Sequence, residues 1–163
     1  MINKKKFDKF QIFHDINSNE LKLVEKFLKR VHFKRGKYII KEKSKGDSLY
    51  ILIKGKVKVT KRLTLALNTK MSEKHYTSFS EEDYASFGEN GLISSGKRSA
   101  NVIALTDCVM FKLTRSCFKE IEEKNLAVAH KLMKNIAFIL SKRLESADED
   151  MMKLATALSI AVS

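Results

Sequence analysis

Hydrophobic residues recur at helical spacing near the start of the chain. Between residues 18 and 31 they fall on one face of a helix, and Ser18 stands where an N-cap is expected. The phenylalanines of residues 7–13 predict an earlier helix or turn packed beside it. The apolar positions of 18–31 are Leu21, Val24, Phe27, Leu28 and Val31.

A different pattern begins at Phe33 and continues to about Leu113. Short apolar runs alternate with charged turns and glycines, and Lys54-Gly55 joins two of the runs as a tight hairpin would. Several short strands separated by turns are typical of a β-sandwich or barrel. The runs cover residues 38–40, 49–53, 57–59 and 109–113.

Residues 60–86 lack such runs. The segment is polar, and charged residues such as Lys70, Lys74 and Glu81 interrupt any strand pattern. It therefore predicts a long loop.

The last third of the chain predicts two helices. A short one runs from Arg115 to about Glu123, and a longer one follows a cap at Asn125. Its apolar residues are three or four positions apart, which gives a heptad seam. They are Leu126, Ala129, Met133, Ile136, Leu140, Leu144, Ala147, Met151, Leu154 and Leu158.

Such a helix is too long to bury its seam against one small barrel. We expect a partner helix, and hence a homodimer through residues 126–158. The alternative is a helix that breaks near Asp148 and folds back on its own domain.

Composition agrees with a globular chain. The 163 residues are 44% apolar and 31% charged, enough for one domain with a sizeable core. No stretch approaches the roughly 20 apolar residues of a membrane span, and the start lacks the apolar run of a signal peptide, so a cytoplasmic protein without membrane contact is expected. Cys108 and Cys117 do not make a disulfide framework and are expected to be reduced.

Charge and reactive residues exclude several classes of function. The net charge of +13 attracts anions, but the lysines are spread along the chain, and a nucleic-acid binder would need a recognition element that is not evident. The four histidines do not have metal-ligand spacing, and neither a nucleophile motif nor a phosphate-binding P-loop is found. We expect no enzyme, no metal and no cofactor.

The most informative segment combines glycine, one carboxylate and one arginine. Gly88-Glu89 is followed nine residues after Glu89 by Arg98-Ser99. A carboxylate accepts hydrogen bonds from sugar hydroxyls, whereas a guanidinium and free backbone N–H groups bind phosphate. Because glycine also lets the backbone approach a ligand, a ribose phosphate fits this set.

This segment resembles the phosphate-binding cassette of cyclic-nucleotide-binding domains, and most closely that of the catabolite-activator type. The matching residues in the cassette are Phe87-Gly88-Glu89, Leu92-Ile93, Arg98-Ser99-Ala100 and Val102. Upstream, Phe33-x-x-Gly36 and the run from Gly46-Asp47-Ser48 to Val57 fit the family's first strands and turns. The likeness covers about residues 10–150. Departures from the pattern are Asn90 for an apolar residue, Lys97 for proline, and no glycine-aspartate pair before Phe87.

The resemblance implies a mainly β fold: a β jelly roll with flanking helices and a long C-terminal α-helix. It divides the chain into a jelly roll with N-terminal helices, 1–124, and a dimerisation or lid helix, 125–163. DNA-binding activators of this family carry a winged helix-turn-helix after that helix. Its absence from the sequence predicts no sequence-specific DNA binding.

The resemblance also implies a ligand and its contacts. The ligand would be cAMP, with cGMP as the alternative; Glu89 would bind the ribose 2′-hydroxyl, and Arg98 and Ser99 the phosphate. The full candidate set adds Gly88, Asn90 and Gly91 from the cassette, and Val57, Phe79, Ala147 and Asp148 as base contacts. Val57 and Phe79 fit a core role equally well, and Asp148 could be a solvated acid.

Two functions remain open from the sequence. One is a stand-alone cyclic-nucleotide sensor whose downstream partner is unknown. The other is a degenerate jelly roll that binds no nucleotide and serves as a dimeric interaction module.

Overall fold

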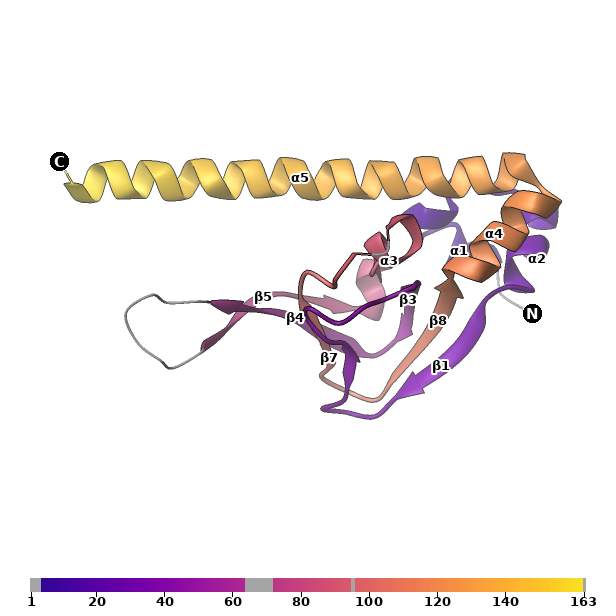
Figure 1. The fold of residues 1–163 in the computed structure, drawn as a ribbon, viewed down its shortest axis with the longest axis horizontal. Helices are drawn as coiled ribbons and strands as arrows, with labels where there is room; N and C mark the ends of the chain where they lie inside the picture. The colour runs from indigo at the N-terminus through magenta and orange to yellow at the C-terminus, as the bar shows by residue number, and fades with distance from the viewer. Residues whose placement is uncertain (1–3, 64–71, 95, 163) are drawn as a thin grey trace.

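The protein is built from two antiparallel four-stranded sheets flanked by helices (Figure 1). The computed structural model describes residues 4–63, 72–94 and 96–162. Within them, one sheet has the order β1-β8-β3-β6 and the other β2-β7-β4-β5. The strands of the first are β1 (Lys29–Phe33), β8 (Cys108–Thr114), β3 (Ser48–Lys54) and β6 (Ser86–Phe87). Those of the second are β2 (Tyr38–Ile40), β7 (Asn101–Ala104), β4 (Lys56–Leu63) and β5 (Ser72–Ser80).

Strand β3 lies between β8 and β6, and both of its faces are buried. Leu49 and Ile51 pack under the helices, whereas Tyr50 and Leu52 face the core between the sheets. Successive side chains of a strand point to opposite faces, so this continuous apolar run serves two hydrophobic clusters. The jelly-roll expectation is confirmed, and the expected strand at residues 38–40 has the same bounds as β2.

The loop expected over residues 60–86 is largely a hairpin. Strand β4 extends to Leu63 and pairs with β5, with a register shift between Val59 and Thr60. A short 3-10 helix, η2 (Glu81–Asp83), then leads to β6. A hairpin satisfies its backbone groups by pairing, so its strands do not need apolar runs. Lys70 lies outside the described residues.

The first predicted helix is shorter than expected. The N-terminal elements are α1 (Lys4–Phe7), η1 (Gln11–Phe13) and α2 (Ser18–Glu25). The cap is Asn17, not Ser18, and it forms a capping box with Glu20. Residues 29–33 form strand β1 instead, because Val31 and Phe33 alternate into the core between the sheets.

The C-terminal helices follow β8. Helix α4 (Arg115–Lys124) leads to α5 (Leu126–Val162), whose first turn is capped by Asn125 Oδ1 accepting from the Val128 N–H at 3.1 Å. Helix α5 is continuous, so the alternative of a helix that breaks near Asp148 is wrong. No helix in the described ranges, α5 included, is apolar enough over a sufficient length to cross a bilayer.

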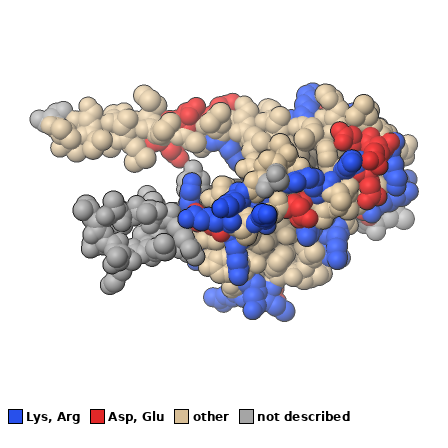
Figure 2. All heavy atoms as spheres, in the orientation of Figure 1, with Lys and Arg blue, Asp and Glu red and all other residues tan. Residues whose placement is uncertain are grey.

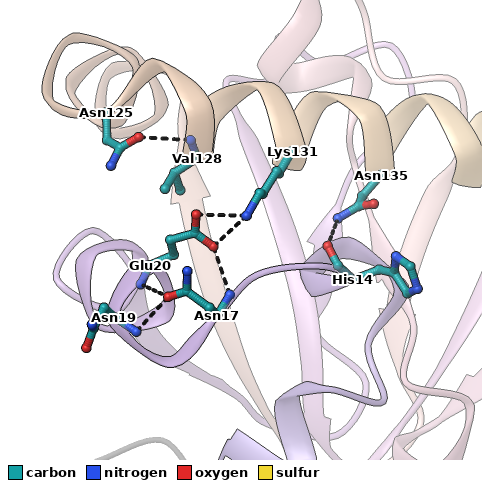
Figure 3. Close-up of polar contacts among 8 residues, drawn as sticks. All are labelled: His14, Asn17, Asn19, Glu20, Asn125, Val128, Lys131 and Asn135. Atoms are coloured by element: carbon teal, nitrogen blue, oxygen red, sulfur yellow. Dashed lines mark hydrogen bonds and ion pairs between the residues drawn. The ribbon is translucent and has the colours of Figure 1, made fainter.

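Polar contacts fix the first half of α5 to the N-terminal segment (Figure 3). Lys131 Nζ donates to Glu20 Oε1 at 2.8 Å. The buried Asn135 amide donates to the carbonyl oxygens of Ile12 and His14 at 3.1 and 2.7 Å. The C-terminal end of the helix extends past the barrel (Figure 1), and residues 151–162 are exposed.

The heptad seam is therefore divided. Ala129 and Ile136 are buried in the domain's own core, and Met133 and Leu140 pack partly against it. The other half of the seam is exposed, and so is Leu126 at its start. The exposed residues further along are Leu144, Met151, Leu154 and Leu158.

Candidate functional site

The cassette is a tight turn followed by a short helix. Gly88 has a φ of 82°, a left-handed conformation that favours glycine, and it connects β6 to α3 (Asn90–Ile93). Buried Phe87 and Leu92 anchor the two ends of the turn. Glu89, between them, is thereby held at the N-terminal end of α3.

Arg98 lies beneath this turn and is almost buried, with 9% of its surface exposed. Its Nη1 donates to the Gly88 carbonyl at 2.8 Å, and its Nη2 donates to the Ser48 carbonyl at 2.7 Å. Burial lowers the pKa of the guanidinium below its usual value, while Tyr50, Asp47 and Glu89 act to raise it. An arginine remains a cation under such a shift, so the site presents a desolvated positive charge.

Glu89 is the second buried charge, also 9% exposed. Its Oε1 accepts a hydrogen bond from Arg143 Nη1 of α5 at 2.6 Å, and Arg143 Nη2 donates to the Ser86 carbonyl at 2.6 Å. The other oxygen, Oε2, is buried and has no hydrogen-bond donor among the described residues. An unpaired buried carboxylate oxygen is costly, so this atom is suited to a donor from a ligand.

A cavity of about 920 Å³ lies between the cassette, the β4–β5 hairpin and α5. The cassette supplies charged and polar groups, including Glu89, Arg98 and Ser99. The hairpin and α5 supply apolar surface, including Val59 and Phe79, together with a few polar groups. The residues lining the α5 side are Phe138, Ile139, Lys142, Arg143, Ser146, Ala147 and Asp150.

The structure brings most of the predicted residues together. The cavity is lined by Gly88, Glu89, Asn90, Arg98, Ser99, Phe79 and Ala147. Three candidates do not line the cavity. Val57 is fully buried in the core between the sheets, and Gly91 is buried within the cassette beside Arg98. Asp148 is exposed on α5. Asp150 lines the cavity instead, because α5 turns Ala147 and Asp150, three residues apart, to the same side.

Two arginines of the site were not predicted. Arg143 lies one helical turn before Ala147, and that i, i+4 spacing on α5 is the signal that could have identified it. Arg115, the first residue of α4, donates from Nε and Nη2 to the Gly91 carbonyl at 3.1 and 2.8 Å, and from Nη2 to the Ser94 carbonyl. It holds the C-terminal end of α3 in place, and no local sequence pattern indicates that contact.

The described residues meet the requirements of neither a metal site nor a disulfide. Within residues 4–63, 72–94 and 96–162, no three or more His, Cys, Asp or Glu side chains form a group that could hold a metal ion. Both cysteines are free thiols, Cys108 buried and Cys117 half-buried. The cavity thus offers binding groups for an anion and for hydroxyl donors.

The cavity on this jelly roll has a buried arginine and an unpaired carboxylate oxygen, and comparison with known proteins identifies the family. The family model "Cyclic nucleotide-binding domain" matches residues 30–125, more than half of the chain. The protein belongs to this family. Its domain is of the type found in catabolite activators and in regulatory domains of cAMP-dependent kinases.

Individual relatives are similar over most of the chain. The "Cyclic AMP receptor protein" of Thermus thermophilus is 27% identical over 137 residues, which is 84% of this chain and 58% of that protein. The chain thus spans less than two thirds of this relative's length.

Two solved structures support the same placement. The crystal structure of the catabolite activator protein of Thermus thermophilus aligns with a TM-score of 0.73 and 26% identity, over 89% of this chain and 63% of that one. The regulatory domain of Toxoplasma gondii PKA, crystallised with cAMP, aligns with a TM-score of 0.64 and 26% identity, over 82% of this chain and 48% of that one.

Proposed function

We propose that the protein is a sensor domain that binds cAMP and signals through a ligand-linked shift of α5. The observation that carries the proposal is the unpaired, buried Oε2 of Glu89 in a cavity that also holds Arg98. The ribose 2′-hydroxyl would donate to this oxygen. Arg98, Ser99 and the N–H groups at the start of α3 would take the phosphate.

The ion pair between Glu89 and Arg143 supplies a route to α5. Arg143 is the point at which the second half of the helix contacts the cassette through charged groups. A ribose that binds Oε2 of Glu89, or packs against Arg143, would change the free energy of that contact. The ligand shifts the helix only to the extent that it binds the two positions with different affinities. The output is conformational and not catalytic.

The base would lie against the apolar walls of the cavity, between Phe79 on β5 and Ala147 on α5. Its polar edge would face Asp150, whereas Asp148 points away from the cavity. We propose cAMP and not cGMP because the Thermus relative, similar over 84% of this chain, is a cyclic AMP receptor protein and the Toxoplasma structure contains cAMP, whereas a cGMP-dependent kinase of Drosophila matches only 30% of the chain. The cytoplasm, where cyclic nucleotides are signals, is the proposed location.

Dimerisation is part of the same proposal. The exposed second half of the α5 seam would pack against a second copy, so that the segment 125–163 acts as both lid and dimer helix on the domain formed by 1–124. Leu144 and Leu158 are 64% and 67% exposed, as expected for residues that meet a partner.

Titration calorimetry with cAMP and cGMP, paired with thermal unfolding, tests the proposal. We expect cAMP to bind and to raise the melting temperature, and Arg98→Ala to lose about 2–5 kcal/mol of binding free energy. Lys97→Ala is the matched control. Lys97 precedes Arg98 in the chain, but its side chain is exposed and does not line the cavity. If neither nucleotide changes the melting temperature, the chain is the non-binding interaction module.

A further inference from the structure

Three glycines from two segments of the chain lie around the guanidinium of Arg98. Gly46 lies in the turn before β3, Gly88 before α3, and Gly91 within α3. A Cβ added to Gly88 or Gly91 would lie 2.8 Å from Arg98 Nη1. A Cβ added to Gly46 would overlap Nε and Cζ, the centre of the guanidinium plane.

Gly46 differs from the other two in the reason that it must be glycine. Gly88 has a positive φ, so its backbone alone favours glycine. A Cβ on Gly91 would also approach the backbone N and O of Ser48 within 3.0 Å. Gly46 has no positive φ, and the three nearest atoms to its added Cβ all belong to the Arg98 side chain. The missing side chain at position 46 therefore makes room for the arginine.

We infer that Gly46 is a positioning residue for Arg98, and this inference rests on the proposed function. The guanidinium occupies the space that a side chain at position 46 would take. In this position Nη1 donates one N–H to the Gly88 carbonyl and Nη2 donates one to the Ser48 carbonyl. Each of the two nitrogens carries a second N–H. The fixed fork can then present these donors to the phosphate without an ordering cost at the moment of binding.

A methyl group at position 46 would displace Arg98 but not the fold. The overlapping atoms belong to the far end of a flexible side chain, which can move more cheaply than backbone. Arg98 would leave its two carbonyl acceptors and lose its orientation toward the ligand. We expect Gly46→Ala to remain folded, with a melting temperature lowered by the loss of these two hydrogen bonds, and to bind cAMP roughly 10- to 100-fold more weakly.

The test compares Gly46→Ala with Gly96→Ala. Gly96 also lacks a positive φ, and its added Cβ would meet only Ser94 Oγ, at 3.2 Å. Gly96→Ala should bind cAMP as the wild type does. In an Arg98→Lys background, Gly46→Ala should have no further effect on affinity, because lysine has no guanidinium plane to displace. The preference between the two phosphorothioate diastereomers of cAMP should fall in Gly46→Ala, which a general loss of stability would not cause.

A measurement without nucleotide separates this inference from the proposed function. Phenylglyoxal modification mapped by mass spectrometry should spare the buried Arg98 of the wild type and modify it in Gly46→Ala. A failure of the wild type to bind either nucleotide overturns the proposed function. The modification result still shows whether Gly46 keeps Arg98 in its buried position. The inference is wrong if Arg98 stays protected in Gly46→Ala, or if that variant weakens cAMP binding equally in the Arg98→Lys background.

Discussion

At the scale of single residues, Glu89 divides its two oxygens between the protein and the cavity. Oε1 is held by Arg143 from α5, and Oε2 has no donor among the described residues. The same carboxylate can therefore sense a ligand hydroxyl and remain joined to the helix. Arg143 neutralises it in the absence of ligand, which limits the cost of burying the charge.

This arrangement predicts that affinity depends on the ribose 2′-hydroxyl. 2′-Deoxy-cAMP should bind about 1.5–3 kcal/mol more weakly than cAMP, the cost of one hydrogen bond to a charged group. Calorimetry on wild type and Glu89→Gln checks the prediction, because the penalty for the deoxy analogue should shrink when the charge is removed. Equal affinities of the wild type for both nucleotides would contradict the role of Glu89.

At the scale of elements, the N-terminal helices and α5 are joined through one carboxylate. Glu20 completes the capping box of α2 and accepts two hydrogen bonds from Lys131 (Figure 3). The Lys131 hydrogen bond, followed by that of the Asn17 N–H, lowers the pKa of Glu20 below its usual 4.5. A lowered folded-state pKa stabilises the fold above the unfolded value, and this contribution is lost as the pH falls through the folded one.

We therefore expect Glu20→Gln to reduce the free energy of unfolding by about 1 kcal/mol at pH 7, as is typical of a partly exposed pair. The difference from wild type should decrease as the pH falls below 4.5, where the wild-type carboxyl also becomes neutral. Urea unfolding at several pH values measures it. Glu122→Gln, an exposed acid on α4, is the control; a pH-independent difference for Glu20→Gln would rule out the titration.

At the scale of the whole molecule, α5 combines two environments in one helix. Its first half is part of the core, whereas its C-terminal end extends past the barrel and is mostly uncharged (Figures 1 and 2). Ile136, one of the seam residues, is only 1% exposed, so a charge there would disrupt the domain itself. The seam can be tested only where it is exposed.

Leu144 and Met151 are suitable positions, 64% and 63% exposed. Sedimentation at concentrations on the order of tens of micromolar should show a wild-type dimer and a Leu144→Lys, Met151→Lys monomer with an unchanged fold, since only an intermolecular apolar contact is removed. The control places lysines at Glu149 and Thr156, which have the same spacing but lie off the seam. A wild-type monomer would exclude the proposed dimer.

The pattern of the sequence located four of the strands in the described residues. It identified residues 38–40, 49–53, 57–59 and 109–113, and it missed β1, β5 and the short strands β6 and β7. A polar strand has no distinct hydrophobic pattern, and a short strand can share the apolar spacing of a helix. Such segments become strands because they pair with neighbouring strands, and not because of their own side chains. The same reason explains why Val57, a candidate base contact, belongs to the core: alternation does not say which face meets a ligand.

The sequence by itself determined the local chemistry of the cassette, because Gly88, Glu89, Arg98 and Ser99 follow a fixed spacing within one short segment. It also predicted a long helix over residues 126–158, which the structure extends to Val162. Only the tertiary structure decided that Arg143 pairs with Glu89 and that Gly46 accommodates the guanidinium of Arg98. These contacts join segments that are distant along the chain. They arise from how the sheets and α5 pack, and no local periodicity encodes which side chains that packing brings together.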